Sequence, residues 1–412
     1  LSSWSAEWLE MAGVNTLRPA FEVDAADRFT SFAIVQEAPP SHPTLRSHRL
    51  AIGFYVITDG ALRRARRVEV DVAGERTELP ELVGAERPDL ILVNDEDLTY
   101  GKIRLDAVSL ETLISSIGLI GDSLAAALCW SAAWDMCRDG EMATRDYLRL
   151  VLSGVSSVTD ISVIQTLLRQ ASVAVRRYAD PDWRAAGLEL MAKSFRSLAV
   201  AASPGSDEQL AFLSAFAGVA TSAADLALLA GLLDGTEVID GLKVDTDLRW
   251  SLLHRLVSRG VLGTADIDAE LARDATDAGS RRAATCRAAI PTPSAKREAW
   301  DQLADGSLPL ATFRAVIRGF IDSDHPALMA PYRDEYFAAL PSIWGTWSSA
   351  MAQDFVEGGY LACPLSVETV AATDTYLAAQ NPPAALLRLL NEGRDDVLRA
   401  LRCQARDKAA QG

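Results

Sequence analysis

Two patterns of hydrophobic and polar positions divide the chain into a short first part and a long second part. Up to about residue 105, apolar and polar residues alternate in short runs, as in Val68–Val72, where valines flank Glu69 and Asp71. A period of two is typical of strands that bury one face. Beyond Asp106, apolar residues recur every three or four positions, which is the period of an amphipathic helix.

About six strands are expected in the first part, separated by turns that contain Gly, Pro and Asp. The expected strands are Phe21–Ala25, Phe29–Val35, His48–Val56, Val68–Val72, Leu90–Val93 and Lys102–Leu105. Asp59-Gly60 and Ala73-Gly74 supply two turns, and a short helix at Trp4–Ala12 precedes the first strand. Roughly 90 residues of short alternating strands favour a small β-sandwich.

The second part is expected to be helical to its end. The expected helices cover residues 110–117, 122–138, 144–152, 160–177, 181–199, 207–221, 225–233, 245–259, 264–275, 280–290, 294–304, 310–320, 327–340, 344–357, 366–379 and 382–407. Many begin with Asp, Ser, Thr or Pro and several end at a glycine, as helix capping favours. We therefore expect a mainly α fold, in which a small N-terminal β-sandwich precedes a HEAT-like α-helical superhelix without a fixed-period consensus.

The net charge of −16 argues against a nucleic-acid partner, because phosphate binding depends on clustered Lys and Arg. No stretch approaches the ~20 consecutive apolar residues of a membrane span, so no membrane partner is expected. The N-terminus lacks a signal-peptide pattern, and its first residue, Leu1, suggests a fragment.

The cysteines suggest a reducing compartment. There are five of them, without a CxxC pair, at Cys129, Cys137, Cys286, Cys363 and Cys403. An odd number of widely spaced cysteines is typical of buried free thiols in a cytosolic protein, so a cytoplasmic location is expected.

A zinc hydrolase site is not expected in this chain. The common form is HExxH on a helix with a downstream Glu, and the four histidines, His42, His48, His254 and His325, are neither followed by Glu nor spaced four apart. His254, within Leu252–Leu256, is interpreted as a residue of the helix surface or the core.

Gly121–Leu124 spells the GDSL signature of serine esterases, and Asp322–His325 spells the DxxH that would complete a triad. A nucleophile elbow needs a strand before the serine, whereas the residues before Ser123 have a helical pattern. We therefore interpret Asp122-Ser123 as a helix cap and the match as chance.

Two charged runs have ordinary interpretations. Arg63–Arg67 could contact a polyanion, but a solvated turn leading into Val68–Val72, balanced by Glu69, Asp71 and Glu75, is favoured in an acidic chain. Asn94–Asp97 suggests calcium but lacks the glycine and the final glutamate of an EF-hand loop, so a loop between strands is favoured.

Three segments resemble known blocks of M1-family zinc aminopeptidases, in the form of the actinobacterial aminopeptidase N. Trp8–Leu17 resembles the segment that joins the thermolysin-like domain to the third domain, and Leu92–Asp106 resembles the Asn…Tyr-x-(Lys/Arg) block that ends the β-domain. Trp130–Met136, followed by Arg138–Glu141, resembles the opening helices of the ERAP1-like C-terminal domain. The three segments follow one another in the family's order.

The resemblance implies a domain division into a linker helix at 1–17, a β-sandwich at 18–107 and an ERAP1-like helical domain at 108–412. The family's GAMEN motif and HExxH…E precede the matched region and are absent from this sequence. No catalytic or metal residue can therefore be transferred, no cofactor is expected in this chain, and the zinc would belong to the parent enzyme. The substrate-binding residues stay unknown.

The resemblance implies a non-catalytic C-terminal portion that closes over the active site and shapes the peptide chamber. Its partners would be the N-terminal catalytic domains and peptide substrates, and the chain alone would be inactive. The alternative is a stand-alone HEAT-like scaffold for protein interactions. An esterase centred on Ser123 is a distant third hypothesis.

Overall fold

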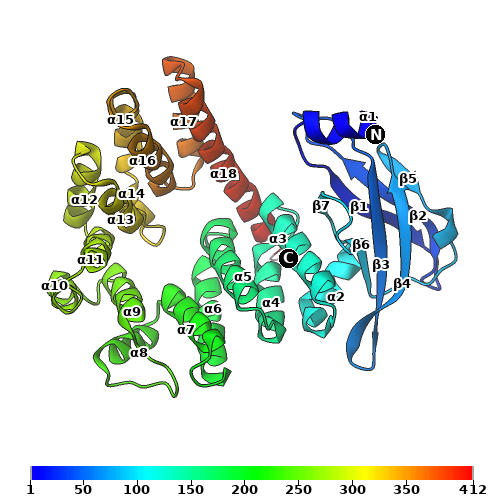
Figure 1. Cartoon of the computed structure of the whole chain (residues 1–412), viewed down its shortest axis with the longest axis horizontal. Coiled ribbons are helices and arrows are strands. Elements are labelled where there is room, and N and C mark those ends of the chain that lie inside the picture. The colour runs from blue at the N-terminus through cyan, green and yellow to red at the C-terminus, as the bar shows by residue number, and fades with distance from the viewer. Residues whose placement is uncertain (1, 411–412) are drawn as a thin grey trace. The chain divides into compact units, whose positions relative to one another are not determined.

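The computed structural model describes residues 2–410, with a small group of strands followed by helices (Figure 1). Val175–Lys408 forms one compact unit, and the rest of the described chain forms the other. This division falls within the helical region, and the expected domain boundaries near residues 17 and 107 stay predictions. The mainly α architecture with a small N-terminal β part is confirmed, and the HEAT-like arrangement stays a prediction.

Two sheets make up the β part of the first unit. One has the strand order β5-β2-β1-β7 and the other has the order β4-β3-β6. The strands are β1 Thr16–Val23, β2 Phe29–Glu37, β3 His48–Thr58, β4 Ala61–Val72, β5 Arg76–Glu78, β6 Leu90–Asp95 and β7 Lys102–Ile103. β1 pairs in parallel with β7, and the remaining neighbours pair antiparallel.

Aromatic side chains join the two sheets into a sandwich. Phe29 and Phe32 of β2 contact Phe54 of β3, with ring centroids 6.4 and 5.9 Å apart. All three rings are buried, as the alternation of apolar positions predicts. The turn expected at Asp59-Gly60 joins β3 to β4, and both residues have positive φ.

The first strand was placed wrongly from the sequence. It covers Thr16–Val23 rather than Phe21–Ala25, because the chain turns at Asp24. The Asp24 carboxylate accepts hydrogen bonds from the backbone N–H groups of Ala26 and Arg28, which fixes a turn where the alternation alone suggested a strand.

Helical segments of the first unit lie before, between and after the strands. They are α1 Ser2–Ser5, η1 Ala6–Glu10, η2 Pro80–Leu82, α2 Ala107–Ser116, η3 Ile117–Leu119, α3 Ser123–Asp139, α4 Thr144–Gly154, η4 Val155–Ser157 and α5 Ile161–Val173. The carboxylates of Asp106, Asp122 and Asp160 accept from backbone N–H groups at the starts of α2, α3 and α5. These caps satisfy amides that have no partner inside the helix.

Helices alone form the second unit, which begins within η5 Ala174–Tyr178. They are α6 Arg184–Ala201, α7 Asp207–Val219, α8 Ala223–Asp234, α9 Thr246–Ser258, α10 Thr264–Arg273, α11 Asp277–Ala289, α12 Pro293–Asp305, α13 Leu310–Phe320, α14 Pro326–Met329, α15 Tyr332–Thr346, α16 Ser349–Ala362, α17 Val367–Gln380 and α18 Ala384–Ala409. One core of this unit is built on Trp300, Phe313, Phe320, Tyr336 and Phe355, and a smaller one on Trp250, Leu253 and Ile267.

The expected break after residue 340 is wrong. Helix α15 continues to Thr346 with Pro341 inside it, and the chain breaks before α16 instead. Phe337, Leu340 and Ile343 form one buried stripe on either side of the proline, so packing holds the helix together at a position where the local preference is to end it. None of the helices within residues 2–410 combines the length and apolar composition that a membrane span requires.

Candidate functional site: a cationic pocket

A pocket of about 620 Å³ lies within the second unit, where η5, α7, α9, α11, α12 and α13 approach the loop after α13. Five cationic side chains line it: Arg176, Arg255, Arg282, Lys296 and Arg318. Among residues 2–410, three carboxylates line it, those of Asp247, Asp322 and Asp324. The pocket therefore carries an excess of positive charge in a chain whose net charge is −16. Its volume falls in the range of small-molecule sites.

Asp324 is the centre of an ion-pair cluster on one wall of this pocket. Its carboxylate pairs with Arg176, with Arg255 at 3.0 Å and with Arg259 at 3.4 Å. Burial alone would raise the pKa of Asp324, but the charges of Arg176 and Arg255 outweigh it and lower that pKa. The carboxylate is therefore ionised at neutral pH and joins the loop to η5 and α9.

The arginines of this cluster also bind the end of α7. Arg176 Nη2 donates to the carbonyl of Gly218 at 2.8 Å, and Arg255 Nε donates to the carbonyl of Ala220 at 2.8 Å. These carbonyls belong to the last turn of the helix and the residue after it, where acceptors lack helical partners and the helix dipole favours cations. The arginines are thus fixed in position before any ligand arrives.

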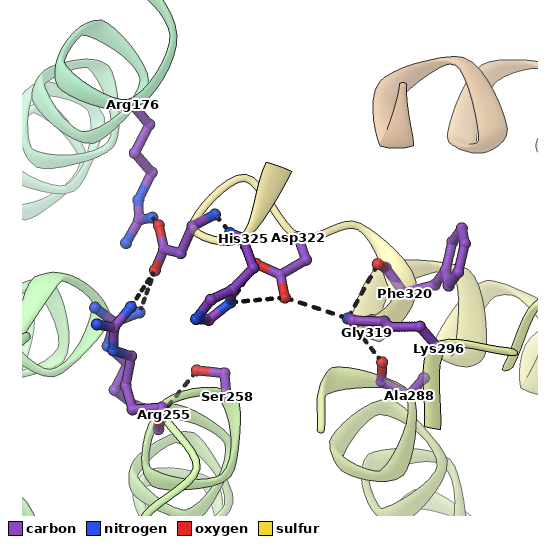
Figure 2. A network of polar contacts seen from close by, with 11 residues as sticks. Arg176, Arg255, Ser258, Ala288, Lys296, Gly319, Phe320, Asp322 and His325 are labelled. Carbon is purple, nitrogen blue, oxygen red and sulfur yellow. Dashed lines mark hydrogen bonds and ion pairs between the residues drawn. The ribbon is translucent and has the colours of Figure 1, made fainter. Parts of the chain in front are cut away.

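Lys296 reaches the same loop from the other side (Figure 2). Its side chain is fully buried, and Nζ donates to the carbonyls of Ala288, Gly319 and Phe320 at 3.0 to 3.2 Å. Nζ also lies 3.5 Å from the carboxylate of Asp322. Burial lowers the pKa of Lys296. One ammonium group thus joins the C-terminal ends of α11 and α13 to the loop.

Two of the histidines considered from the sequence lie at this site. His254 lines the pocket, and burial together with the charges of Arg255, Lys296 and Arg318 lowers its pKa to about 4. It is neutral at physiological pH. His325 contacts the Asp322 carboxylate through Nδ1 at 3.0 Å.

The other two histidines lie in the β part. His42 is exposed and contacts the hydroxyl of Ser41, whereas His48 is buried with both ring nitrogens bonded, to Thr99 and Gln36. Burial, followed by the charge of Arg46, lowers the pKa of His48 to about 4. Within residues 2–410, no three His, Cys, Asp or Glu side chains gather in a way that could hold a metal ion, so the described residues do not fit a zinc site.

Ser123 does not lie in the nucleophile elbow that the esterase hypothesis requires. Ser123 is the first residue of α3 in the first unit, and Asp322 and His325 belong to the second. A 3₁₀ helix rather than a strand precedes Ser123, and the Asp122 carboxylate accepts from the amides of Leu124 and Ala125. The interpretation of Asp122 as a helix cap is confirmed.

The interpretation of Arg63–Arg67 as a turn is wrong, because the run lies inside strand β4. Arg64 pairs with Asp95 and Glu96, and Arg67 pairs with Glu69 and Glu96. Two of these partners, Asp95 and Glu96, lie at the end of β6 and directly after it, across β3 from β4 in the sheet, and the sequence could not place them there. These contacts make the run part of a charge network within the β part of the first unit.

Asn94–Asp97 forms the end of β6 and the turn after it. Asn94, Glu96 and Asp97 have positive φ, and the Asn94 side chain bonds the backbone of Thr99 in both directions. These contacts explain the polar run as a tight turn, in agreement with the loop interpretation.

The sequence alone does not predict the residues that build the pocket, namely Arg176, Arg255, Lys296 and Asp324. One signal was present: Arg255 follows His254 inside the apolar run Leu252–Val257 of α9, and an arginine on an apolar face usually has a buried partner. Asp324 drew notice only as part of Asp322–His325.

The profile of the ERAP1-like C-terminal domain family matches residues 90–399. The chain belongs to this family. Over its full length it is 49% identical to aminopeptidase N of Streptomyces lividans, of which it covers 49%. It is also similar to aminopeptidase A of Legionella pneumophila, whose crystal structure holds aspartic acid, with a TM-score of 0.53 and 12% identity. That likeness covers 95% of this chain and 49% of the other, and it shows the fold alone. The chain thus spans about half the length of the proteins it matches.

Proposed function

We propose that this chain is the non-catalytic C-terminal portion of a zinc-dependent M1 aminopeptidase, which removes N-terminal residues from peptides in the cytoplasm. The observation that carries the proposal is the 49% identity, along the whole chain, to half of an aminopeptidase N. The proposal assigns the zinc to the other half of the parent enzyme, because the described residues offer no three-ligand group.

The lining of the pocket supports the proposed role of the helical part. A pocket lined by both guanidinium and carboxylate groups can contact the polar ends and side chains of a peptide. In the proposal, the helices close over the active site of the catalytic domains and form the chamber for the distal part of the peptide. The β-sandwich and the segment before it join the helices to those domains.

The isolated chain tests the assignment of the chemistry. Purified without its partner half, it is expected to hold well under one zinc per chain and to hydrolyse aminoacyl p-nitroanilides no faster than buffer. Zinc is measured by mass spectrometry and turnover by absorbance, with full-length Streptomyces aminopeptidase N as the positive control. One zinc per chain together with chelator-sensitive turnover would overturn the proposal.

A further inference from the structure

The ion pairs around Asp324 leave positive charge uncompensated. We define the arginine cluster as Arg176, Arg184, Arg255 and Arg259. Three of these guanidinium groups share the single carboxylate of Asp324, and the fourth, Arg184, interacts electrostatically with both Asp324 and Arg176. The neighbouring carboxylate, that of Asp322, is engaged by Lys296 and His325.

Two nitrogens of the cluster also lack acceptors. In the part of the chain that the structure describes, Arg255 Nη2 and Arg184 Nε are buried without a hydrogen-bond partner. The side chain of Arg255 is only 8% exposed. A buried guanidinium nitrogen without an acceptor is costly and rare in folded proteins. Burial lowers the pKa of Arg255 to about 10, and the charges of Arg176 and Arg259 add to this effect, although Asp324 opposes it.

The pocket gives a ligand access to two arginines of this cluster. Arg176, Arg255 and Asp324 line it, and Figure 2 shows Arg176 and Arg255 approaching from two different elements. Arg318 lines the same pocket and is exposed, and no hydrogen bond or ion pair of its side chain is found among residues 2–410. The field inside the pocket is positive, since Arg255, Lys296 and Arg318 all lower the pKa of His254.

The charge and the geometry favour a phosphate group over a carboxylate. Asp324 already supplies one carboxylate to the four arginines of the cluster. A ligand carboxylate would add only one negative charge and would leave positive charge uncompensated. A phosphate carries about −1.5 to −2 charges at neutral pH and three or more acceptor oxygens, which several guanidinium groups can share. Arginine forks match phosphate oxygens with two parallel hydrogen bonds.

We propose that the arginine cluster binds one phosphate group, as inorganic phosphate or as a phosphomonoester, in the pocket beside Asp324. Arg176 and Arg255 donate to its oxygens, and Arg318 contributes charge from the same pocket. Asp324 acts as a built-in counter-ion, which holds the arginines together when the ligand is absent. This inference goes beyond the proposed accessory role, since the cluster lies within one unit and does not depend on a catalytic partner.

The test measures phosphate binding to the 412-residue chain by calorimetry and thermal shift, at constant ionic strength balanced with NaCl. Inorganic phosphate and glycerol 3-phosphate are expected to bind saturably, whereas acetate is not. Tighter binding of the ester assigns an organic phosphate as the ligand, and equal binding assigns inorganic phosphate.

Arg176→Gln and Arg318→Gln should each weaken phosphate binding by about tenfold, the loss expected for one charge-assisted contact. Arg402→Gln, an exposed arginine of α18, removes the same charge outside the pocket and should change nothing.

Histidine NMR locates the ligand, because the chain has only four histidines. A bound phosphate offsets the cations that lower the pKa of His254, so that pKa should rise while the pKa of the exposed His42 stays constant. Asp324→Asn should tighten phosphate binding several-fold, because it removes the like charge beside the ligand. The proposal is overturned by any of three results: no saturable binding, equal binding in all the arginine variants, or binding of acetate as strong as that of phosphate.

Discussion

Replacing Asp324 by asparagine is expected to lower the free energy of unfolding of the second unit by about 3 kcal/mol, near the lower end of the range for breaking a buried ion pair. Asparagine keeps the size of the side chain but removes the charge that Arg176, Arg255 and Arg259 share. The three guanidinium groups would then repel one another in a poorly solvated place. Urea unfolding followed by tryptophan fluorescence reports the loss, because Trp250 and Trp300 lie in this unit.

The effect of Asp324→Asn should depend on pH in a defined direction. The folded pKa of Asp324 lies below its unfolded value, which is about 3.9. The carboxylate therefore contributes its full stability above about pH 4 and loses it as the pH falls through the folded pKa. The difference in unfolding free energy between the wild type and the variant should shrink in acid.

Asp240→Asn, which changes an exposed aspartate of the same unit, is the control and should stay within about 0.5 kcal/mol of the wild type. A loss for Asp324→Asn no larger than this control would contradict the assignment.

Replacing Lys296 by methionine is expected to cost about 3 kcal/mol as well, through lost hydrogen bonds rather than through repulsion. Methionine fills nearly the same volume, but the carbonyls of Ala288, Gly319 and Phe320 would lose their donor inside the core. Asp322 would lose its buried cation. The same urea titration measures the effect.

Two further variants distinguish this role of Lys296 from a general charge effect. Lys243→Met removes an exposed lysine of the same unit and should be nearly neutral. Lys296→Met combined with Asp322→Asn should cost less than the sum of the two single changes, because the residues share one ion pair. A stable Lys296→Met variant, or strictly additive losses, would show that the buried ammonium does not hold the helix ends together.

Much of the fold can be predicted from the sequence, because contacts between nearby residues decide it. The alternation at Val68–Val72 and the cap at Asp122 are decided by neighbours a few residues away, and both were predicted correctly. The continuation of α15 through Pro341 and the position of Arg63–Arg67 inside β4 were not predicted, because tertiary contacts decide both. A continuous buried stripe keeps α15 helical through its proline, and carboxylates at the end of β6 hold two arginines of the basic run in β4.

The pocket could not be predicted from the sequence, because its residues lie far apart along the chain. Arg176 and Asp324 are 148 positions apart, and only the packing of η5 and α9 around the loop after α13 brings them together. Nothing in the composition of either segment marks it as one half of an ion pair. The family, in contrast, could be recognised from short blocks such as Leu92–Asp106, because a resemblance between sequences does not require the contacts to be known.

The most direct test of the central claim is the activity of a chimera. In it, this chain replaces the C-terminal half of Streptomyces lividans aminopeptidase N, to which it is 49% identical. If the chain is the accessory portion of such an enzyme, kcat/KM for an aminoacyl p-nitroanilide should stay within about tenfold of the Streptomyces enzyme. The N-terminal half alone should fall at least about a hundredfold, because the chamber that positions the substrate is missing. A chimera no more active than the isolated N-terminal half would contradict the claim.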